Sequence, residues 1–122
     1  MDGWIKIHRK ILEWEWYDDI NTKVLFWHLL LTANHKDKKW RGQTIKRGQR
    51  LTSLEHLAKE VGLTVQQTRT SLNKLKSTSE ITIKSTNKFT VVTIEKYSDY
   101  QINEKENNKQ NNKRDNKRTT NK

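Results

Sequence analysis

The residues with the clearest capacity for chemistry lie in one stretch of the chain, from Thr64 to Ser77. Amide groups of Gln and Asn can pair with adenine edges in the major groove of DNA, Arg can pair with guanine, and Thr and Lys can bind phosphates. No acidic residue stands between Val65 and Ser79, whereas a solvated helix surface normally includes Glu for intrahelical pairs. The pattern predicts a DNA-contacting surface that consists of Gln66, Gln67, Arg69, Thr70, Asn73 and Lys74.

A helix must hold these side chains on one face. Thr64 and Gln67 fit a capping box, which begins a helix by satisfying backbone N–H groups of its first turn. Residues that can be buried then recur at helical spacing, and they are Val65, Thr68, Leu72 and Leu75. The stretch therefore predicts a helix with one buried side and one polar side.

A second helix is expected just before this one. Thr52 and Glu55 fit another capping box, and the buried side of the helix that follows would consist of Leu54, Leu57, Ala58 and Val61. Gly62 stands where a helix C-terminus favours a left-handed backbone, and Leu63 follows as a buried turn residue. Two short helices joined by a tight Gly-containing turn form the helix-turn-helix pattern.

A β-hairpin is predicted after the two helices. Residues Ile81 to Lys84 and Phe89 to Ile94 alternate in polarity as strands do, and a polar turn joins them. A turn of two or four residues would bury Ile81, Ile83, Val92 and Ile94, whereas a slip by one residue would bury Phe89 and Val91 instead. At the tip, Lys84 and Lys88 suit phosphate contacts, and Asn87 suits the minor groove.

The N-terminal third is rich in Trp and predicts two further helices. One runs from Trp4 to Leu12 with Asp2 as its cap, and the other runs from Thr22 to Ala33 after Asn21. The second is apolar nearly all round, so both of its faces must be covered. We expect self-association through Trp4, Ile7, Ile11, Trp14, Val24, Trp27 and Leu31. Stacking of Trp14, Trp16 and Trp27 on single-stranded bases is the alternative use of these rings.

The segment between the N-terminal helices and the helix-turn-helix predicts short extended pieces. A polar loop covers residues 35 to 39, and extended segments cover Trp40 to Ile45 and Gln49 to Leu51. The turn between them falls at residues 46 to 48, where Gly48 follows the basic pair of Lys46 and Arg47.

Charge and length limit the class of protein. The 122 residues include 25 Lys and Arg against 14 Asp and Glu, a net charge of +11, which favours nucleic acid first and an anionic membrane second. We expect one domain over residues 1–102 and a disordered basic tail or truncated linker over 103–122, since that tail has no apolar residue at all. The chain has no cysteine and no signal-peptide-like or membrane-spanning run, which favours a cytoplasmic protein.

Catalytic and metal-binding patterns are absent from the sequence. The four His residues are scattered, and His28 in its apolar helix is interpreted as a core histidine with a hydrogen-bond partner. There is no HExxH motif, no glycine-rich phosphate loop and no Cys/His cluster. Asp18 and Asp19, the only adjacent acidic pair, are explained by a helix-entry turn. We therefore expect no enzymatic activity, no metal and no cofactor.

Three segments carry a resemblance to a known family. The stretches GWIKIHRKILEWEWY, FWHLLLTANHKDKKWRGQTIKRGQRLTS and LAKEVGLTVQQTRTSLNKLKSTSEITIKSTNKFTVVTIEKYSDYQ cover residues 3–101 almost completely. They resemble the N-terminal domain of phage and prophage replisome organisers, which are DnaD-like replication initiation proteins. The resemblance implies an oligomerising winged-helix domain that binds DNA in replication initiation and helps to recruit a helicase loader.

The chain departs from this pattern in two places. Such proteins commonly continue through a polar linker into a second helical domain, whereas this sequence stops within what resembles the linker. Ser79 also stands where a Gly is expected to end the helix before the hairpin.

The expected fold is α+β, a winged helix-turn-helix with an extra N-terminal helix and a C-terminal β-hairpin wing. The expected function is sequence-preferring binding of double-stranded DNA in replication initiation, with a helix in the major groove. A winged-helix transcriptional regulator would need the same helix, and a protein-interaction module that recruits a helicase loader is a further alternative.

Overall fold

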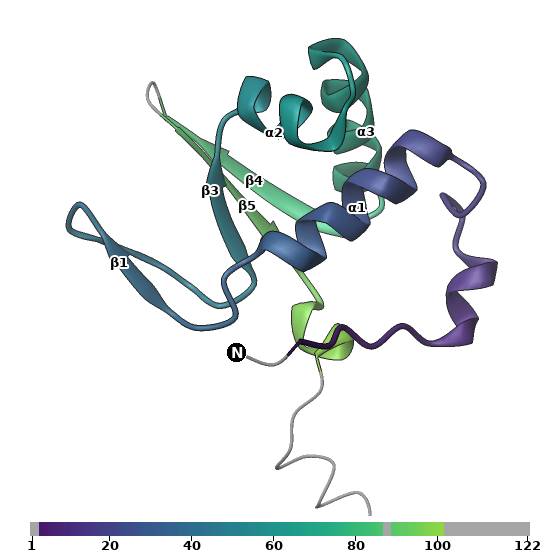
Figure 1. Ribbon diagram of the computed structural model, residues 1–122, viewed down its shortest axis with the longest axis horizontal. Helices are drawn as coiled ribbons and strands as arrows, with labels where there is room; N and C mark the ends of the chain where they lie inside the picture. The colour runs from purple at the N-terminus through teal and green to yellow at the C-terminus, as the bar shows by residue number, and fades with distance from the viewer. Residues whose placement is uncertain (1–2, 87–88, 102–122) are drawn as a thin grey trace, which may run out of the picture.

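The three helices and two small antiparallel sheets of the described residues form an α+β structure (Figure 1). The computed structural model describes residues 3–86 and 89–101, so the predictions for Asp2, Asn87, Lys88 and the 103–122 tail lie outside the described residues. None of the helices within these ranges is long and apolar enough to cross a membrane. In chain order the elements are η1 (Arg9–Glu13), α1 (Ile20–Thr32), β1 (Lys38–Trp40), β2 (Gln43–Ile45), β3 (Gln49–Thr52), α2 (Leu54–Val61), α3 (Val65–Ser77), β4 (Ile81–Ser85), β5 (Thr90–Ile94) and η2 (Tyr97–Tyr100).

The larger sheet has the strand order β3-β5-β4 with both pairings antiparallel. Ile81 pairs with Ile94 and Ile83 pairs with Val92, so the first of the two predicted registers is correct. Three of these four side chains are buried and Ile83 is half-buried. Because strand residues alternate between faces, Phe89 and Val91 lie on the opposite side of the sheet, where both are partly exposed.

The core lies between this sheet and the helices. Helix α1 packs mainly against α3, and α2 packs against α3 and also contacts α1 (Figure 1). The buried cluster draws on all three helices and on strands β4 and β5, and its largest members include Leu25, Phe26, Leu29, Leu57 and Leu75. A buried hydrogen bond of 3.1 Å from Thr22 Oγ1 to Ser71 Oγ joins α1 to α3.

Helices α2 and α3 and the turn between them form as their local signals predict. Gly62 ends α2 with a φ of 79°, the left-handed conformation that favours glycine. At the start of α3, Gln67 N donates to Thr64 Oγ1 and Thr64 N donates to Gln67 Oε1, each at 3.0 Å, which confirms the capping box. The predicted cap of α2 is wrong by one residue, because Thr52 belongs to β3 and Ser53 accepts the capping bond.

The end of α3 takes the conformation expected of glycine although a serine is present. Ser79 has a φ of 63°. Its N–H donates to the carbonyl of Lys76, and the N–H of Glu80 donates to that of Leu75 at 2.9 Å. These two bonds are the pattern of a Schellman motif. The helix therefore ends in this motif although a left-handed backbone is unfavourable for a residue with a side chain.

The predicted helix from Trp4 to Leu12 is wrong. The chain runs extended at Ile5, which forms an antiparallel bridge with Gln101, and Lys6 N donates to the carbonyl of Tyr100 at 2.7 Å. Only the 3-10 helix η1 follows, capped by the side chain of His8. Backbone hydrogen-bonding groups here pair with a segment almost a hundred residues away in the sequence, and no local pattern reveals such a partner.

Two other boundaries differ from the sequence prediction. Helix α1 begins earlier than predicted, because Asp19 rather than Asn21 accepts the capping bond from Thr22 N. The segment predicted as one extended piece from Trp40 to Ile45 instead contains the end of β1, a turn and β2, and β1 begins within the predicted polar loop of residues 35 to 39. The turn has Arg41 at a φ of 49° and Gly42 at 79°. Two successive positive φ values are those of a type I′ turn. The predicted turn at residues 46 to 48 is confirmed by the bond from Gln49 N to Lys46 O.

Candidate nucleic-acid interface

The exposed face of α3 brings together three of the predicted site residues. Arg69 Nη1 donates to Gln66 Oε1 at 3.0 Å, and Gln66 Nε2 lies 3.4 Å from Thr70 Oγ1. These spacings of three and four residues place the side chains next to one another on the helix surface. All three are exposed, and α3 contains no acidic residue. The face therefore presents a positive charge together with amide and hydroxyl groups that can donate and accept hydrogen bonds.

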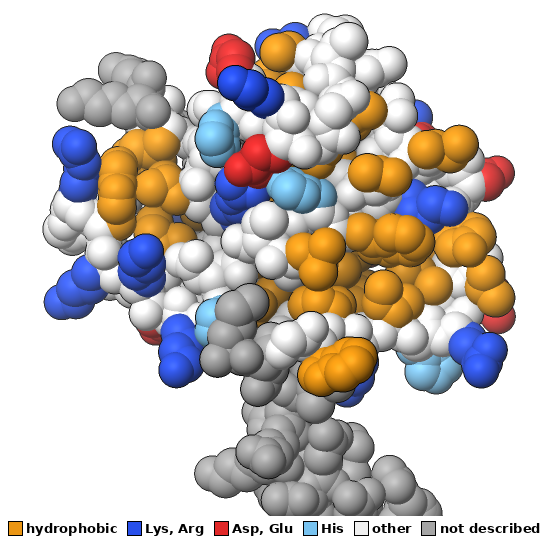
Figure 2. Space-filling model, viewed as in Figure 1, with side chains coloured by type: hydrophobic (Ala, Val, Ile, Leu, Met, Phe, Trp, Pro, Cys, Tyr) orange, Lys and Arg blue, Asp and Glu red, His pale blue; other side chains and the backbone are white. Residues whose placement is uncertain are grey.

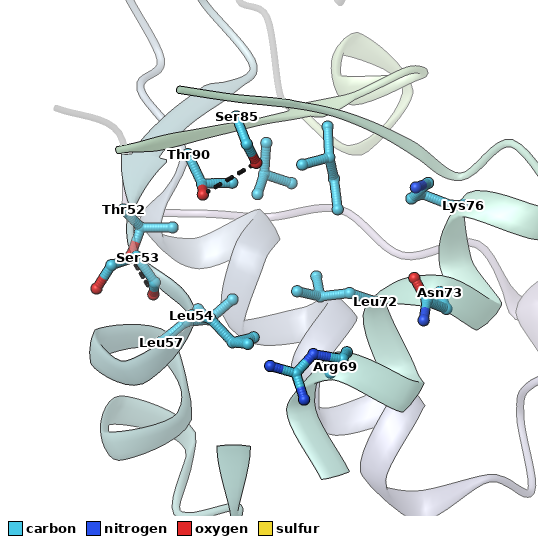
Figure 3. Close-up of a pocket in the computed structure, with 12 residues that line it drawn as sticks. Thr52, Ser53, Leu54, Leu57, Arg69, Leu72, Asn73, Lys76, Ser85 and Thr90 are labelled. Carbon is cyan, nitrogen blue, oxygen red and sulfur yellow. Dashed lines mark hydrogen bonds between the residues drawn. The ribbon is translucent and has the colours of Figure 1, made fainter. Parts of the chain in front are cut away.

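A groove of about 330 Å³ separates α3 from the β4–β5 hairpin (Figure 3). Arg69, Asn73 and Lys76 line it from α3, and the hydroxyls of Ser85 and Thr90, 3.3 Å apart, line it from the hairpin. Its apolar lining consists of Leu54, Leu57, Leu72, Ile83 and Val92. One wall thus carries cations and the other carries hydroxyls, a combination suited to a phosphate-sugar backbone.

Lys76 is a groove residue that the sequence prediction missed. It lies seven residues after Arg69 and three after Asn73, so the three side chains share one stripe of α3. The same spacing rule, applied to the last turn of the helix as well as the first, identifies it.

Two predicted contact residues on α3 have structural partners instead. The side-chain carbonyl of Gln67 belongs to the capping box. Lys74 Nζ lies 2.6 Å from Asp19 Oδ2 and 5.7 Å from the centre of the Trp16 ring. The hydrogen bond from Lys74 holds the pKa of the Asp19 carboxyl below its usual value. Lys74 therefore joins α3 to the start of α1, one helical turn beyond Thr70, and its side chain stays 40% exposed.

Lys84 also lies apart from the groove. Ile83 and Ser85 line the groove from β4, so the alternation of strand residues places Thr82 and Lys84 on the other side of the sheet. The hydrogen bond from Thr82 Oγ1 to Glu95 agrees with that placement. The hairpin thus contributes hydroxyls to the groove and directs the charge of Lys84 away from it.

The residues predicted for self-association divide into separate groups. Trp14 is partly buried and packs against the core, since its ring lies 5.2 Å from that of Phe26 and its Nε1 donates to Glu80 at 3.1 Å. Val24 and Leu31 are exposed on the outer side of α1, with Trp27 partly exposed between them. Trp4 and Ile7 are exposed on the N-terminal segment and Ile11 is half-buried. Hydrophobic side chains gather over α1 and the segment before it (Figure 2).

A cluster of charged groups joins α1, β3 and α2 on another part of the surface. The Glu60 carboxylate accepts two bonds from Arg50, at 2.6 and 2.8 Å, and lies 2.8 Å from His28 and 3.0 Å from His56. Hydrogen bonds from Arg50 and then His28 lower the pKa of Glu60 to about 2. His28 therefore has a partner, as predicted, although it is only partly buried. Within the described ranges, no group of three or more His, Cys, Asp or Glu side chains could hold a metal ion.

Comparisons of the chain with models of protein families, with curated proteins and with solved structures find no match. The function must therefore be inferred from the chemistry of the surface formed by α3 and the groove beside it.

Proposed function

We propose that this chain binds double-stranded DNA, with α3 in the major groove and the β4–β5 hairpin against the phosphate backbone. The observation that carries the proposal is the exposed, acid-free face of α3, where Arg69 is held beside Gln66 and Thr70. Arg pairs with guanine and Gln pairs with adenine in the major groove, so this face can read base edges. Asn73 and Lys76 continue the same side into the groove.

The arrangement of the elements supports a winged helix-turn-helix. A helix, a strand, two helices and a two-stranded hairpin follow in that order as α1, β3, α2, α3, β4 and β5, with β5 in the centre of the sheet. In such a fold the second helix of the pair enters the major groove, and the hairpin lies beside it as the wing. The net charge of +11 favours a polyanionic partner.

We place this DNA binding in replication initiation, because the resemblance of residues 3–101 is to replisome organisers. Mapping of bound sites on the source genome tests the assignment. Clustered repeats at an origin agree with it, whereas sites confined to promoters would make the chain a transcriptional regulator instead.

Arg69→Ala is the decisive substitution for DNA binding. If Arg69 reads a base, its loss weakens binding by about 1–3 kcal/mol, or roughly 5- to 150-fold. Fluorescence anisotropy with a labelled duplex that carries the mapped site measures the change. Arg9→Ala, which removes an exposed arginine from η1, is the matched control. Equal affinities of the two variants at physiological salt would remove α3 from the binding surface.

Self-association through α1 is part of the proposed function. Ile20, Val24, Trp27 and Leu31 are spaced by four, three and four residues, the a/d spacing of a helix-pairing seam. Ile20 and Leu31 are 69% and 66% exposed. The stripe extends along about 16 Å of helix, and a second copy of α1 would cover it.

Leu31→Glu tests this seam, because the side chain is exposed and the fold does not depend on it. Light scattering at micromolar concentration is expected to show a dimer for the unmodified chain and a monomer for the variant. Leu12→Glu changes a leucine that is 62% exposed on η1 and serves as the control. A monomeric mass for the unmodified chain in the same light-scattering measurement would contradict the proposal.

A further inference from the structure

The β1–β2 hairpin is a second projection beside the β4–β5 hairpin. Both extend from the same end of the molecule (Figure 1). The Trp40 ring of β1 meets the Phe89 ring next to β5 edge-on, with the ring centres 5.3 Å apart and the planes at 85°. Ile45, at the other end of the hairpin, is buried. The hairpin is therefore anchored at both ends, and its position relative to the wing is fixed.

The hairpin carries cations for which the described residues offer no carboxylate partner. Lys38, Lys39 and Arg41 are exposed, and no acidic residue occurs between Lys38 and Gly48. Among the described residues, the ion pairs lie elsewhere, around Glu60 and Asp19. The nearest carboxylate in the sequence, Asp37, accepts a hydrogen bond from the backbone N of Arg47. Lys and Arg side chains gather at this end around a small hydrophobic area (Figure 2).

The aromatic pair positions these cations and does not offer a stacking platform. The Arg41 guanidinium lies 5.2 Å from the centre of the Trp40 ring, which is close enough for a cation–π contact. Phe89 packs against the same ring, and Trp40 is half-buried. A base would have to displace Arg41 to stack there. The chemistry that remains available to a ligand is therefore positive charge.

Lys84 joins this group from the wing. It pairs with Val91 across the β4–β5 ladder, and Val91 lies on the same side of the sheet as Phe89. The side of the wing that faces away from the groove therefore holds a cation next to the aromatic pair that anchors the hairpin. Lys38, Lys39, Arg41 and Lys84 are here called the basic arm.

We propose that the basic arm binds phosphates of the same duplex that α3 contacts, beyond the wing. This inference rests on the proposed function, because a duplex held by α3 and the wing supplies the phosphates. The arm reads no sequence, since its groups are point charges or a single guanidinium with no neighbouring amide that could select a base. Its role is to lengthen the contacted stretch of backbone and to raise affinity at low salt.

The test removes two charges from the hairpin without disturbing its turn. Lys39→Gln is an exposed change, and Arg41→Asn keeps the turn because asparagine is favoured where a type I′ turn has positive φ. The double variant Lys6→Gln/Arg9→Gln removes the same charge from exposed positions on the N-terminal segment and serves as the control. Anisotropy titrations with a labelled random-sequence 24-bp duplex and with oligo(dT) are repeated over a series of salt concentrations.

The plot of log K against log salt has a negative slope on the duplex, and loss of two phosphate contacts makes that slope less steep by about 1.8. For each protein, the affinity at about 50 mM salt is divided by the affinity at about 200 mM salt. Relative to the unmodified chain, this ratio is about twelvefold smaller for the hairpin variant and unchanged for the control. An unchanged duplex slope overturns the inference while leaving the proposed function intact. A slope change on oligo(dT) alone overturns it in favour of a single-strand site. If Arg69→Ala binds normally but the hairpin variant does not, the contact by α3 fails and the phosphate contact by the arm stands.

Discussion

The charged cluster around Glu60 predicts a specific acid sensitivity of the fold. Arg50 and His28 hydrogen-bond to this carboxylate and lower its pKa from 4.5 to about 2. A carboxyl whose pKa is lower in the folded state than in the unfolded state stabilises the fold when it is ionised. This contribution is complete above about pH 4.5 and is lost as the pH falls towards 2.

The size of the effect follows from the shift. A shift from 4.5 to about 2 corresponds to about 3 kcal/mol of folding free energy. The Glu60 side chain is 29% exposed, so solvent screening reduces the value to about 2 kcal/mol. Glu60→Gln removes the titration and leaves the Arg50 guanidinium, whose side chain is 14% exposed, without its carboxylate. We therefore expect the variant to be less stable at pH 6 and to approach the unmodified protein near pH 2.

Urea denaturation followed by circular dichroism, at intervals between about pH 6 and about pH 2, gives both free energies of unfolding. The quantity that matters is the difference between the unmodified chain and Glu60→Gln, because the other carboxylates contribute equally to both. Glu55→Gln, an exposed change on the same helix, controls for the loss of one negative charge. A difference that stays constant across this pH range would refute the role assigned to the carboxylate of Glu60.

Three further predictions concern backbone geometry, and urea denaturation at neutral pH measures each. Gly48→Ala is expected to cost about 3 kcal/mol, because φ is 83° and the new Cβ would lie 2.9 Å from Tyr97 Cβ. Ser79→Gly is expected to raise stability by about 1 kcal/mol, since φ is 63° at that position. Thr64→Ala is expected to cost about 1 kcal/mol by removing the hydroxyl that accepts from Gln67 N.

Each of these has a distinct contrary result. A neutral Gly48→Ala would mean that Tyr97 and the turn can shift together at little cost. No gain from Ser79→Gly would mean that the serine side chain compensates for its backbone conformation. Thr64→Ser should retain stability where Thr64→Ala does not, and equal losses in both would show that the capping bond is not responsible.

The sequence predicted best where the signal and the structure are both local. The capping box at Thr64 and Gln67 and the left-handed Gly62 each involve residues within one helical turn, and both are confirmed. The same local logic missed the hairpin turn at Arg41, because a bulky residue with positive φ is uncommon and gives no turn signal. Helix α3 formed over the predicted stretch, so its exposed face could be inferred from spacing alone.

Contacts between distant segments decided the remaining features. The residues from Trp4 to Ile11 have helical spacing, yet the backbone at Ile5 and Lys6 pairs with Gln101 and Tyr100. Lys74 belongs to the predicted contact set by type and position, yet its ammonium pairs with Asp19 at the start of α1. Both outcomes depend on which partner the fold brings near, and spacing within one element carries no information about that partner.

The pairing of Ile5 with Gln101 has a mechanical consequence. In an antiparallel pair that closes the chain into a ring, tension applied at residues 3 and 101 acts on the same end of the pair. The bond from Lys6 N to Tyr100 O would then be pulled open from one end, as in a zipper. Under stretching, this single bridge is therefore expected to open before the three-stranded sheet, whose two strand pairs run over four and five residue pairs.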